Sequence, residues 1–264
     1  MNRADTVTPH EKPIPPDNVR LPTRGFTIDR SKALIASAVL WAGFALVVWL
    51  VLNGRTGGFD EFGLLAARRE GDLQFAGTHL MLEMVRDTTA LGGVLLRNLF
   101  AIAAVVALLF LSLRREAALF AMTVAGGWIA NSALKGIVGR ERPQIVPHLM
   151  EAGGESFPSG HSFNSAVVYI AMALAFASMS SRHSVRYSLI GSAMVLSAMI
   201  AWSRVMLGVH FPSDVTAGWL GGAGWAFLAA ALLYKPAKAA ADSEVAETLD
   251  PTTTAHSEHP AAPR

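Results

Sequence analysis

Residues 33–52, ALIASAVLWAGFALVVWLVL, form an unbroken run without a charged side chain. A helix that crosses a bilayer needs about 20 mostly apolar residues, so this run predicts a membrane span. Five further runs of similar character follow it: 91–113, which is charged only at Arg97, 117–134, 162–181, 187–203 and 215–234. Six such runs leave too few amphipathic faces for the core helices of a soluble protein. We therefore expect an all-α, polytopic membrane protein with six transmembrane helices in a bundle.

The composition of the 264-residue chain agrees with this class. Hydrophobic residues make up 52% and charged residues 16%, against about 25% charged in soluble domains. The formal net charge is only +2 and the basic residues are scattered, so we expect no nucleic-acid partner. The chain contains no cysteine, which excludes disulfides, zinc–thiolate sites, iron–sulfur clusters and cysteine nucleophiles.

Basic residues predict the orientation of the spans. Six spans place both termini on one side, and cytoplasmic segments of membrane proteins are enriched in Lys and Arg. The basic residues of this side are Arg3, Lys12, Arg20, Arg24, Arg30, Lys32, Arg114, Arg115, Arg182, Arg186, Lys235 and Lys238. We therefore expect cytoplasmic termini and outward-facing first, third and fifth loops. The first span starts too late and runs too long for a cleaved signal peptide.

The segments around the spans predict the domain boundaries. Residues 1–31 are rich in proline, and we expect them to form a disordered cytoplasmic tail. Residues 32–235 are expected to form the six-span domain. Residues 236–264 are expected to form a second disordered cytoplasmic tail. In the long first loop, residues 59–70 are expected to form a short interfacial helix. Asp87, Thr88 and Thr89 are expected to cap the helix of the second span.

Several unusual polar residues stand at the ends of predicted spans. Counting crossings places the end of the third span, the start of the fourth, the end of the fifth and the start of the sixth at the same, outer membrane face. The residues at these ends are Lys135, Arg140, Glu141, Arg142, Ser159, His161, Arg204, His210 and Asp214. Charged groups beside a span are unfavourable in free energy and often functional. The topology therefore predicts a polar cluster at the outer face.

The composition of this cluster favours a phosphoryl group as its ligand. Lys135, Arg142 and Arg204 are fixed cations, and the planar Arg guanidinium matches phosphate oxygens. Ser159 can cap a helix start, and Gly160 allows an anion to approach free backbone N–H groups. Taken singly, each residue has an ordinary explanation as a helix cap or as a side chain that snorkels to the interface.

Two histidines add a possible reaction. His210 can act as a nucleophile toward phosphorus if a carboxylate holds its other ring nitrogen, and Asp214 lies four residues further on. His161 is the candidate general acid for the leaving oxygen. Arg97 has two interpretations, as a residue that snorkels outward or as part of this site.

The spacing of these residues resembles that of the type 2 phosphatidic acid phosphatase family, which shares its phosphate site with vanadium haloperoxidases. The three motifs are Lys135-x6-Arg142-Pro143, Pro158-Ser159-Gly160-His161 and Ser203-Arg204-x5-His210-x3-Asp214. They are complete and in order, and together they are highly specific. The motifs cover residues 135–214, and the pattern of spans extends the resemblance to about residues 33–234.

The resemblance implies a role for each motif residue. His210 would attack phosphorus to form a phosphohistidine, Asp214 would orient His210, and His161 would protonate the leaving group. The phosphate would be bound by Lys135, Arg142, Ser159, Gly160 and Arg204. The resemblance implies neither a metal nor another cofactor, because the cations stabilise the transition-state charge.

The expected function is an integral-membrane lipid phosphatase of a bacterial inner membrane, with its site on the periplasmic or extracellular side. The candidate substrates are undecaprenyl diphosphate, phosphatidate and phosphatidylglycerol phosphate. Membrane lipids are further expected partners, and the sequence leaves the oligomeric state open. The alternative is a membrane phosphotransferase that passes a phosphoryl group or phospho-headgroup to an acceptor other than water. A vanadate-dependent oxidoreductase and a non-catalytic lipid carrier are weaker alternatives, because the former are soluble proteins and the latter would not need every motif residue.

Overall fold

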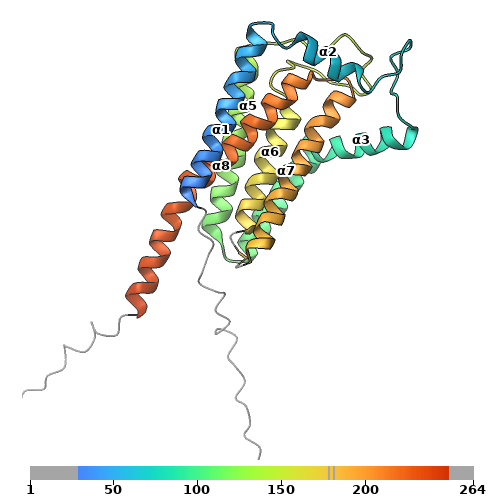
Figure 1. Ribbon diagram of the computed structural model, residues 1–264. Helices are drawn as coiled ribbons and strands as arrows, with labels where there is room; N and C mark the ends of the chain where they lie inside the picture. The colour runs from blue at the N-terminus through green and yellow to red at the C-terminus, as the bar shows by residue number, and fades with distance from the viewer. Residues whose placement is uncertain (1–28, 178, 181, 250–264) are drawn as a thin grey trace, which may run out of the picture.

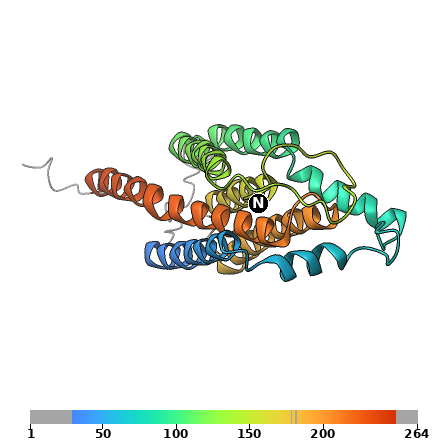
Figure 2. The ribbon, with the colours of Figure 1, turned by 90° about the horizontal axis from the view of Figure 1, so that it is seen from above.

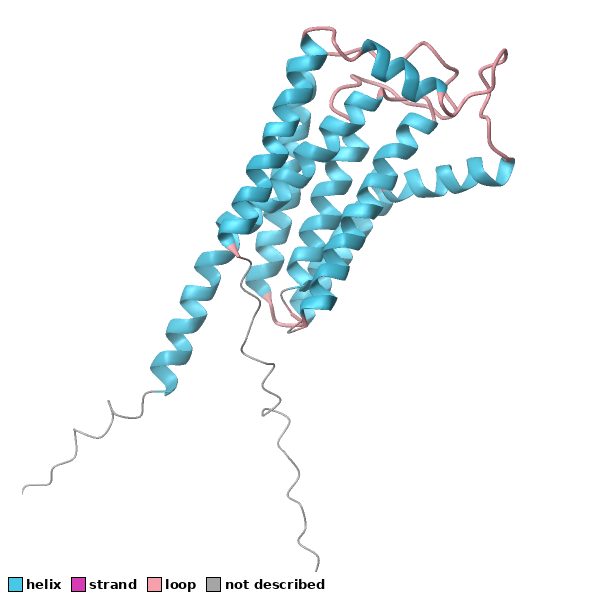
Figure 3. Cartoon of the chain, viewed as in Figure 1, coloured by secondary structure: helices cyan, strands magenta, loops and turns pink. Residues whose placement is uncertain are grey.

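The computed structural model describes residues 29–249, apart from 178 and 181. The regular secondary structure of this part of the chain is helical, and one isolated β-bridge joins Arg68 and Phe75 in a connection (Figures 1 and 3). The helices are α1 (Arg30–Leu52), α2 (Gly57–Leu65), α3 (His79–Leu91), α4 (Val94–Phe110), α5 (Arg114–Val138), α6 (Gly160–Ala177), α7 (His183–Met206) and α8 (Pro212–Leu249). The all-α class expected from the sequence is confirmed.

All six predicted spans coincide with helices. α1, α5, α6, α7 and the first part of α8 are each long and apolar enough to cross a membrane. The second predicted span, 91–113, falls mainly on α4, which follows α3 after a bend of 49°, and the two helices are long and apolar enough to cross a membrane only as a pair. A Cβ atom added to Gly92 at this break would lie 2.3 Å from Ile200 Cγ2, so the bend packs directly against α7.

The expected helix cap at residues 87–89 is wrong. α3 runs through these residues to Leu91, and the residue that precedes α4 is Gly93. Residues 79–91 have a polar and an apolar face with helical spacing, and this pattern continues across Asp87. The polar residues at 87–89 therefore lie inside one helix rather than at the start of the next.

α6 is the central helix of the bundle. Of its apolar stretch, 78% is buried inside the protein, against 11% for α1, and it packs against α5, α7 and α8. A Cβ atom added to Gly222 of α8 would lie 2.2 Å from the backbone oxygen of Phe163. Small residues allow transmembrane helices to approach this closely. The close contact fixes the start of α8 beside the start of α6.

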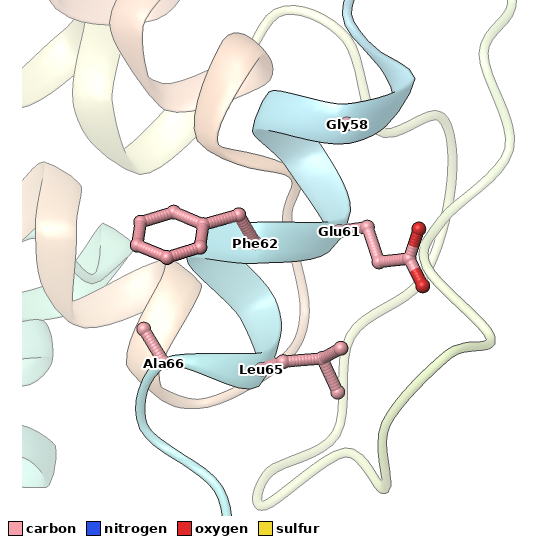
Figure 4. A pocket seen from close by; sticks show the side chains of 5 residues that line it. All are labelled: Gly58, Glu61, Phe62, Leu65 and Ala66. Carbon is pink, nitrogen blue, oxygen red and sulfur yellow. The ribbon is translucent and has the colours of Figure 1, made fainter.

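α1 lies along α8, and α2 lies across the same end of the bundle as the start of α8 (Figures 1 and 2). α2 covers part of the segment predicted as an interfacial helix. Its exposed side carries Phe59 and Phe62, which are 55% and 74% exposed, whereas Asp60 and Leu64 are buried. Figure 4 shows Phe62 and Glu61 pointing to opposite sides of this helix. The pattern is typical of a helix at a membrane surface.

α8 continues to Leu249, well beyond residue 234, where the sixth predicted span ended. Residues 236–249 were expected to belong to a disordered tail, and the structure has them as helix. Their many alanines have a high intrinsic helix propensity, which the assignment to a tail did not take into account. Residues 1–28 and 250–264 of the predicted tails lie outside the described residues.

Candidate active site

The eight predicted site residues come together at one end of the bundle, the upper end in Figure 1. The last turn of α5 carries Lys135, and Arg142 follows that helix; the last turn of α7 carries Arg204. Gly160 and His161 start α6, and His210 and Asp214 lie just before and just inside the start of α8. Two contacts join these elements directly: Ser159 N donates to Asp214 O (3.1 Å), and Arg142 Nη1 lies 3.1 Å from His210 Nε2.

The start of α8 holds the Asp214 carboxylate in place. Pro212 is the first helical residue, a position that proline favours. Asp214, the third, reaches back so that its Oδ2 accepts the N–H of Phe211 (3.0 Å), as the acidic residue of a capping box does. The same Oδ2 lies 3.5 Å from His210 Nδ1. His210 is 2% exposed and Asp214 is fully buried.

Ser156 lies against both His210 and Asp214. Its hydroxyl donates to Asp214 Oδ2 and lies 3.2 Å from His210 Nδ1. The sequence analysis did not identify Ser156, because it lies in a connection without a motif. Its backbone N–H donates to Arg140 O (2.7 Å), which fixes that connection against the end of α5.

The environment of His210 sets its charge and its tautomer. Burial lowers the pKa of His210 to about 4; Asp214 opposes this shift, whereas Arg142 and Arg204 add to it. Because Arg142 can only donate, Nε2 presents a lone pair toward it and the ring proton belongs on Nδ1, which faces Ser156 and Asp214. His210 is thus a neutral imidazole with its Nε2 lone pair directed at a cation.

Arg142 contacts this ring nitrogen, and two further cations, Lys135 and Arg204, belong to the same group of predicted site residues. Arg142 is held by three carbonyl oxygens, those of Val209 (2.7 Å), Gly153 (2.8 Å) and Gly154 (3.1 Å). Burial lowers the pKa of Arg142, but an arginine remains charged. Lys135 Nζ donates to the carbonyl of Glu155 (2.5 Å). Arg204 donates to Thr89 Oγ1 (3.0 Å), and its buried Nε has no hydrogen-bond partner.

The start of α6 completes the cationic cup. Ser159 is fully buried, and its Oγ accepts from the N–H (3.4 Å) and hydroxyl (3.0 Å) of Ser162. A Cβ atom on Gly160 would lie 3.7 Å from Lys135 Cε, so the helix start lies beside the lysine. Backbone N–H groups and the helix dipole favour an anion at such a position.

His161 lies against the bend of the second span. A Cβ atom on Gly92 would lie 3.2 Å from His161 Cδ2. Arg97 is 6% exposed and donates to the carbonyl of Gly92 (3.2 Å). Of its two interpretations, the structure therefore excludes outward snorkelling and places Arg97 inside the bundle, next to the bend that contacts His161.

A buried ionic network supports Asp214 from the other side. Arg140 donates to Asp214 Oδ1 (2.7 Å) and to Asp60 Oδ2 (2.8 Å), and its guanidinium lies 4.0 Å from the centre of the Phe211 ring. Ser213 donates to Asp60 through both its backbone N–H (2.9 Å) and its hydroxyl (2.8 Å). Arg140 therefore bridges two buried carboxylates and ties α2 to the start of α8.

The sequence analysis assigned no role to Arg140 and did not identify Asp60. In the sequence Asp60 stands beside the exposed Glu61, and only the structure shows that its carboxylate is buried and therefore requires a partner. Across the described part of the chain, no group of three His, Asp or Glu side chains has the geometry to hold a metal ion.

Comparisons with known proteins agree with this arrangement. The family model of the PAP2 superfamily matches residues 115–238. Lipid A 1-phosphatase of Rhizobium etli is 36% identical over 125 residues, which are 44% of this chain and 49% of that protein. Phosphatidylglycerophosphatase B of Bacillus subtilis is 37% identical over 94 residues, 34% of this chain and 44% of the relative. The putative undecaprenyl-diphosphatase YbjG of Escherichia coli is 44% identical over 75 residues, 28% and 33% of the two chains.

The fold also resembles a solved structure. The crystal structure of a transmembrane PAP2-type phosphatidylglycerolphosphate phosphatase from Bacillus subtilis superposes with a TM-score of 0.66 at 26% identity, covering 73% of this chain and 93% of that one. The matched segments of the curated relatives span about half of their length or less.

The bundle defines an integral, multi-pass membrane protein that carries a cluster of cationic side chains at one end. Residues 115–238, which contain all three motifs, match the PAP2 superfamily, and the fold agrees with this match. The family suggested by the three motifs is confirmed.

Proposed function

We propose that this protein is a lipid phosphatase that works through a phosphohistidine on His210. The observation that carries the proposal is the buried, neutral His210, whose Nδ1 faces Asp214 and whose Nε2 faces Arg142. A carboxylate that orients the far nitrogen of a histidine prepares the near nitrogen for nucleophilic attack.

In the first step, the Nε2 lone pair forms a bond to phosphorus and the bond between phosphorus and the lipid oxygen breaks. His161 donates a proton to that leaving oxygen. Asp214 stabilises the positive charge that develops on the ring of His210. Arg142, Arg204 and Lys135, with the N–H groups at the start of α6, stabilise the phosphoryl oxygens in the transition state.

In the second step, water attacks the phosphohistidine. His161, now deprotonated, accepts a proton from this water, the bond between phosphorus and nitrogen breaks, and its electrons return to Nε2. Phosphate leaves and both histidines regain their starting forms. The cations and the helix start carry the charge stabilisation, so the scheme requires no metal ion.

The candidate substrates are lipids with a terminal phosphate or diphosphate. The names of the relatives support this class, since they cover a lipid A 1-phosphatase, a phosphatidylglycerophosphatase and a putative undecaprenyl-diphosphatase. The positive-inside pattern supports cytoplasmic termini and a site at the outer face of a bacterial inner membrane. The six-span domain at residues 32–235 is the part to which we assign this activity.

Phosphate release by the detergent-purified, full-length protein tests the proposal. We expect release from an isoprenyl diphosphate or from phosphatidate in the presence of EDTA, and its loss in His210→Ala. Equal release by wild type and variant would contradict the role of His210, and loss of activity on adding EDTA would contradict the metal-free scheme. Transfer to an alcohol in place of water would instead establish the phosphotransferase alternative.

A further inference from the structure

The bend between α3 and α4 leaves two backbone carbonyl groups without helical partners (Figure 1). α3 ends at Leu91, and Gly93, the residue before α4, has extended backbone angles with φ −64° and ψ 158°. In an unbroken helix, the carbonyls of Leu91 and Gly92 would accept the N–H groups four residues further on. The bend removes both bonds, and an unpaired carbonyl in apolar surroundings is unfavourable in free energy.

Two buried side chains supply the missing hydrogen bonds. The hydroxyl of Tyr169 on α6 donates to the carbonyl of Leu91 (2.7 Å). Arg97 of α4 donates through Nη1 to the carbonyl of Gly92 (3.2 Å). Tyr169 is 3% and Arg97 6% exposed. A charged side chain inside a membrane span is rare and usually functional, so the position of Arg97 at this bend calls for a role.

The bend is also the support of the His161 imidazole. A Cβ atom on Gly92 would lie 3.2 Å from His161 Cδ2 and 2.9 Å from Ser165 Oγ, so both side chains pack directly on the backbone of the bend. Among residues 29–249, apart from 178 and 181, none forms a hydrogen bond with the His161 imidazole. The orientation of this ring therefore depends on its packing against Gly92.

One face of α6 carries all of these contacts. His161, Ser165 and Tyr169 follow one another at intervals of four residues, which places them on the same side of the helix. Tyr169 is bonded to the bend at one end of this row, and His161 packs against the bend at the other end. The hydrogen bond of Tyr169 thus fixes the distance between the bend and the helix that carries His161.

We propose that Tyr169 and Arg97 are positioning residues that hold the His161 imidazole by fixing the carbonyls of Leu91 and Gly92. The inference rests on the proposed function, in which His161 protonates the leaving oxygen, and adds two residues that do not touch the substrate. A general acid must lie within hydrogen-bond distance of the oxygen that it protonates. Without the two bonds the bend shifts, and the imidazole loses the surface that orients it.

The test varies the leaving group. Tyr169→Phe removes only the hydroxyl and keeps the ring beside Phe100, with ring centroids 6.2 Å apart. Tyr187→Phe is the matched control, because Tyr187 is 70% exposed on α7. kcat/KM is measured with phenyl phosphate and p-nitrophenyl phosphate, since p-nitrophenolate departs without a proton and phenolate departs less readily. In Tyr169→Phe we expect a decrease of about tenfold for phenyl phosphate and of less than about twofold for p-nitrophenyl phosphate.

Arg97→Met is the second variant, and Asn98→Leu is its control, because Asn98 is the adjacent, exposed polar residue of α4. We expect the same dependence on the leaving group in Arg97→Met and wild-type kinetics in Asn98→Leu. Two outcomes would overturn the inference. They are an equal decrease for both aryl phosphates, which is the result of a general loss of structure, and equal kinetics of Tyr169→Phe and Tyr187→Phe.

NMR of histidine-labelled protein in detergent separates the two proposals, because it does not depend on turnover. The ring signal of His161, assigned by its absence in His161→Gln, should move by more than its line width in Tyr169→Phe and keep its position in Tyr187→Phe. An unchanged signal in Tyr169→Phe would overturn the positioning role even in an active enzyme. If wild type released phosphate from no substrate, the proposed function would fail, and a shifted His161 signal would still support the contact between the bend and this ring.

Discussion

His210 combines two properties that rarely occur together in a histidine, full burial and a ring nitrogen directed at a cation. Both follow from its neighbours. Arg142 donates hydrogen bonds to three backbone carbonyl groups, so turning its side chain away would break these bonds. Asp214 is held by its hydrogen bond at the first turn of α8. If His210 is the nucleophile, as we propose, its surroundings prepare it before a substrate arrives, which is how electrostatic preorganisation reduces a barrier.

The pKa of His210 predicts its pH behaviour. Because burial lowers this pKa from 6.5 to about 4, the ring should remain neutral as the pH falls to 5.5, where an ordinary histidine is mostly protonated. NMR of histidine-labelled protein in detergent would follow the titration, with the signal assigned by its absence in His210→Gln. A midpoint near 6.5 would contradict the buried environment seen here.

We expect a substitution at Asp60 to affect catalysis, although Asp60 is not among the residues proposed to contact the substrate. Asp60→Asn removes one of the two carboxylates that hold Arg140, and thereby loosens Asp214. We expect kcat to fall about tenfold, the equivalent of about 1.4 kcal/mol, with KM little changed. The control is Glu61→Gln, the adjacent exposed carboxylate. An Asp60→Asn variant with the kinetics and the pH profile of Glu61→Gln would exclude a positioning role.

At the scale of elements, the contact between α6 and α8 places His210 beside the cationic cup. Gly222 allows this contact because its missing side chain leaves room for the Phe163 carbonyl. The Ser159–Asp214 backbone hydrogen bond, 3.1 Å long, lies at the end of the same interface. Helix spacing and site geometry are therefore coupled.

Gly222→Ala tests this coupling. The added methyl group would overlap the Phe163 carbonyl, and overpacking of this kind destabilises by about 1–3 kcal/mol. We expect a lower melting temperature in detergent and lower phosphate release. Gly191→Ala on α7 is the control, because its Cβ atom would meet nothing within 4 Å. Identical melting temperatures for Gly222→Ala and Gly191→Ala would show that α6 and α8 can move apart without a loss of stability.

The sequence predicts the helices better than their junctions. Long apolar runs report membrane spans directly, and motif spacing identifies the residues of the cup. The position of α3 depends on packing at Gly92 against α7, and the role of Asp60 depends on where α2 lies across α8. Neither contact leaves a periodic signal, because both join segments that are distant in the chain.

For the whole molecule, the distribution of basic residues predicts the orientation in the membrane. Arg114, Arg115, Arg182 and Arg186 lie at the end of the bundle opposite the candidate site. An alkaline phosphatase fused to the C-terminus should be inactive, because this reporter folds only outside the cytoplasm, and a fluorescent protein fused there should be bright. The reverse pattern would place the candidate site in the cytoplasm.

The bond network between α2 and the start of α8 has a consequence for the synthesis of the chain. Asp60 leaves the ribosome soon after the first span, whereas its partner Ser213 emerges with the last. Until then the Asp60 carboxylate lacks this partner, and the proposed nucleophile is not yet in its final geometry. A chain released before the last span would therefore lack both the candidate active site and the hydrogen bonds that hold its first loop against the bundle.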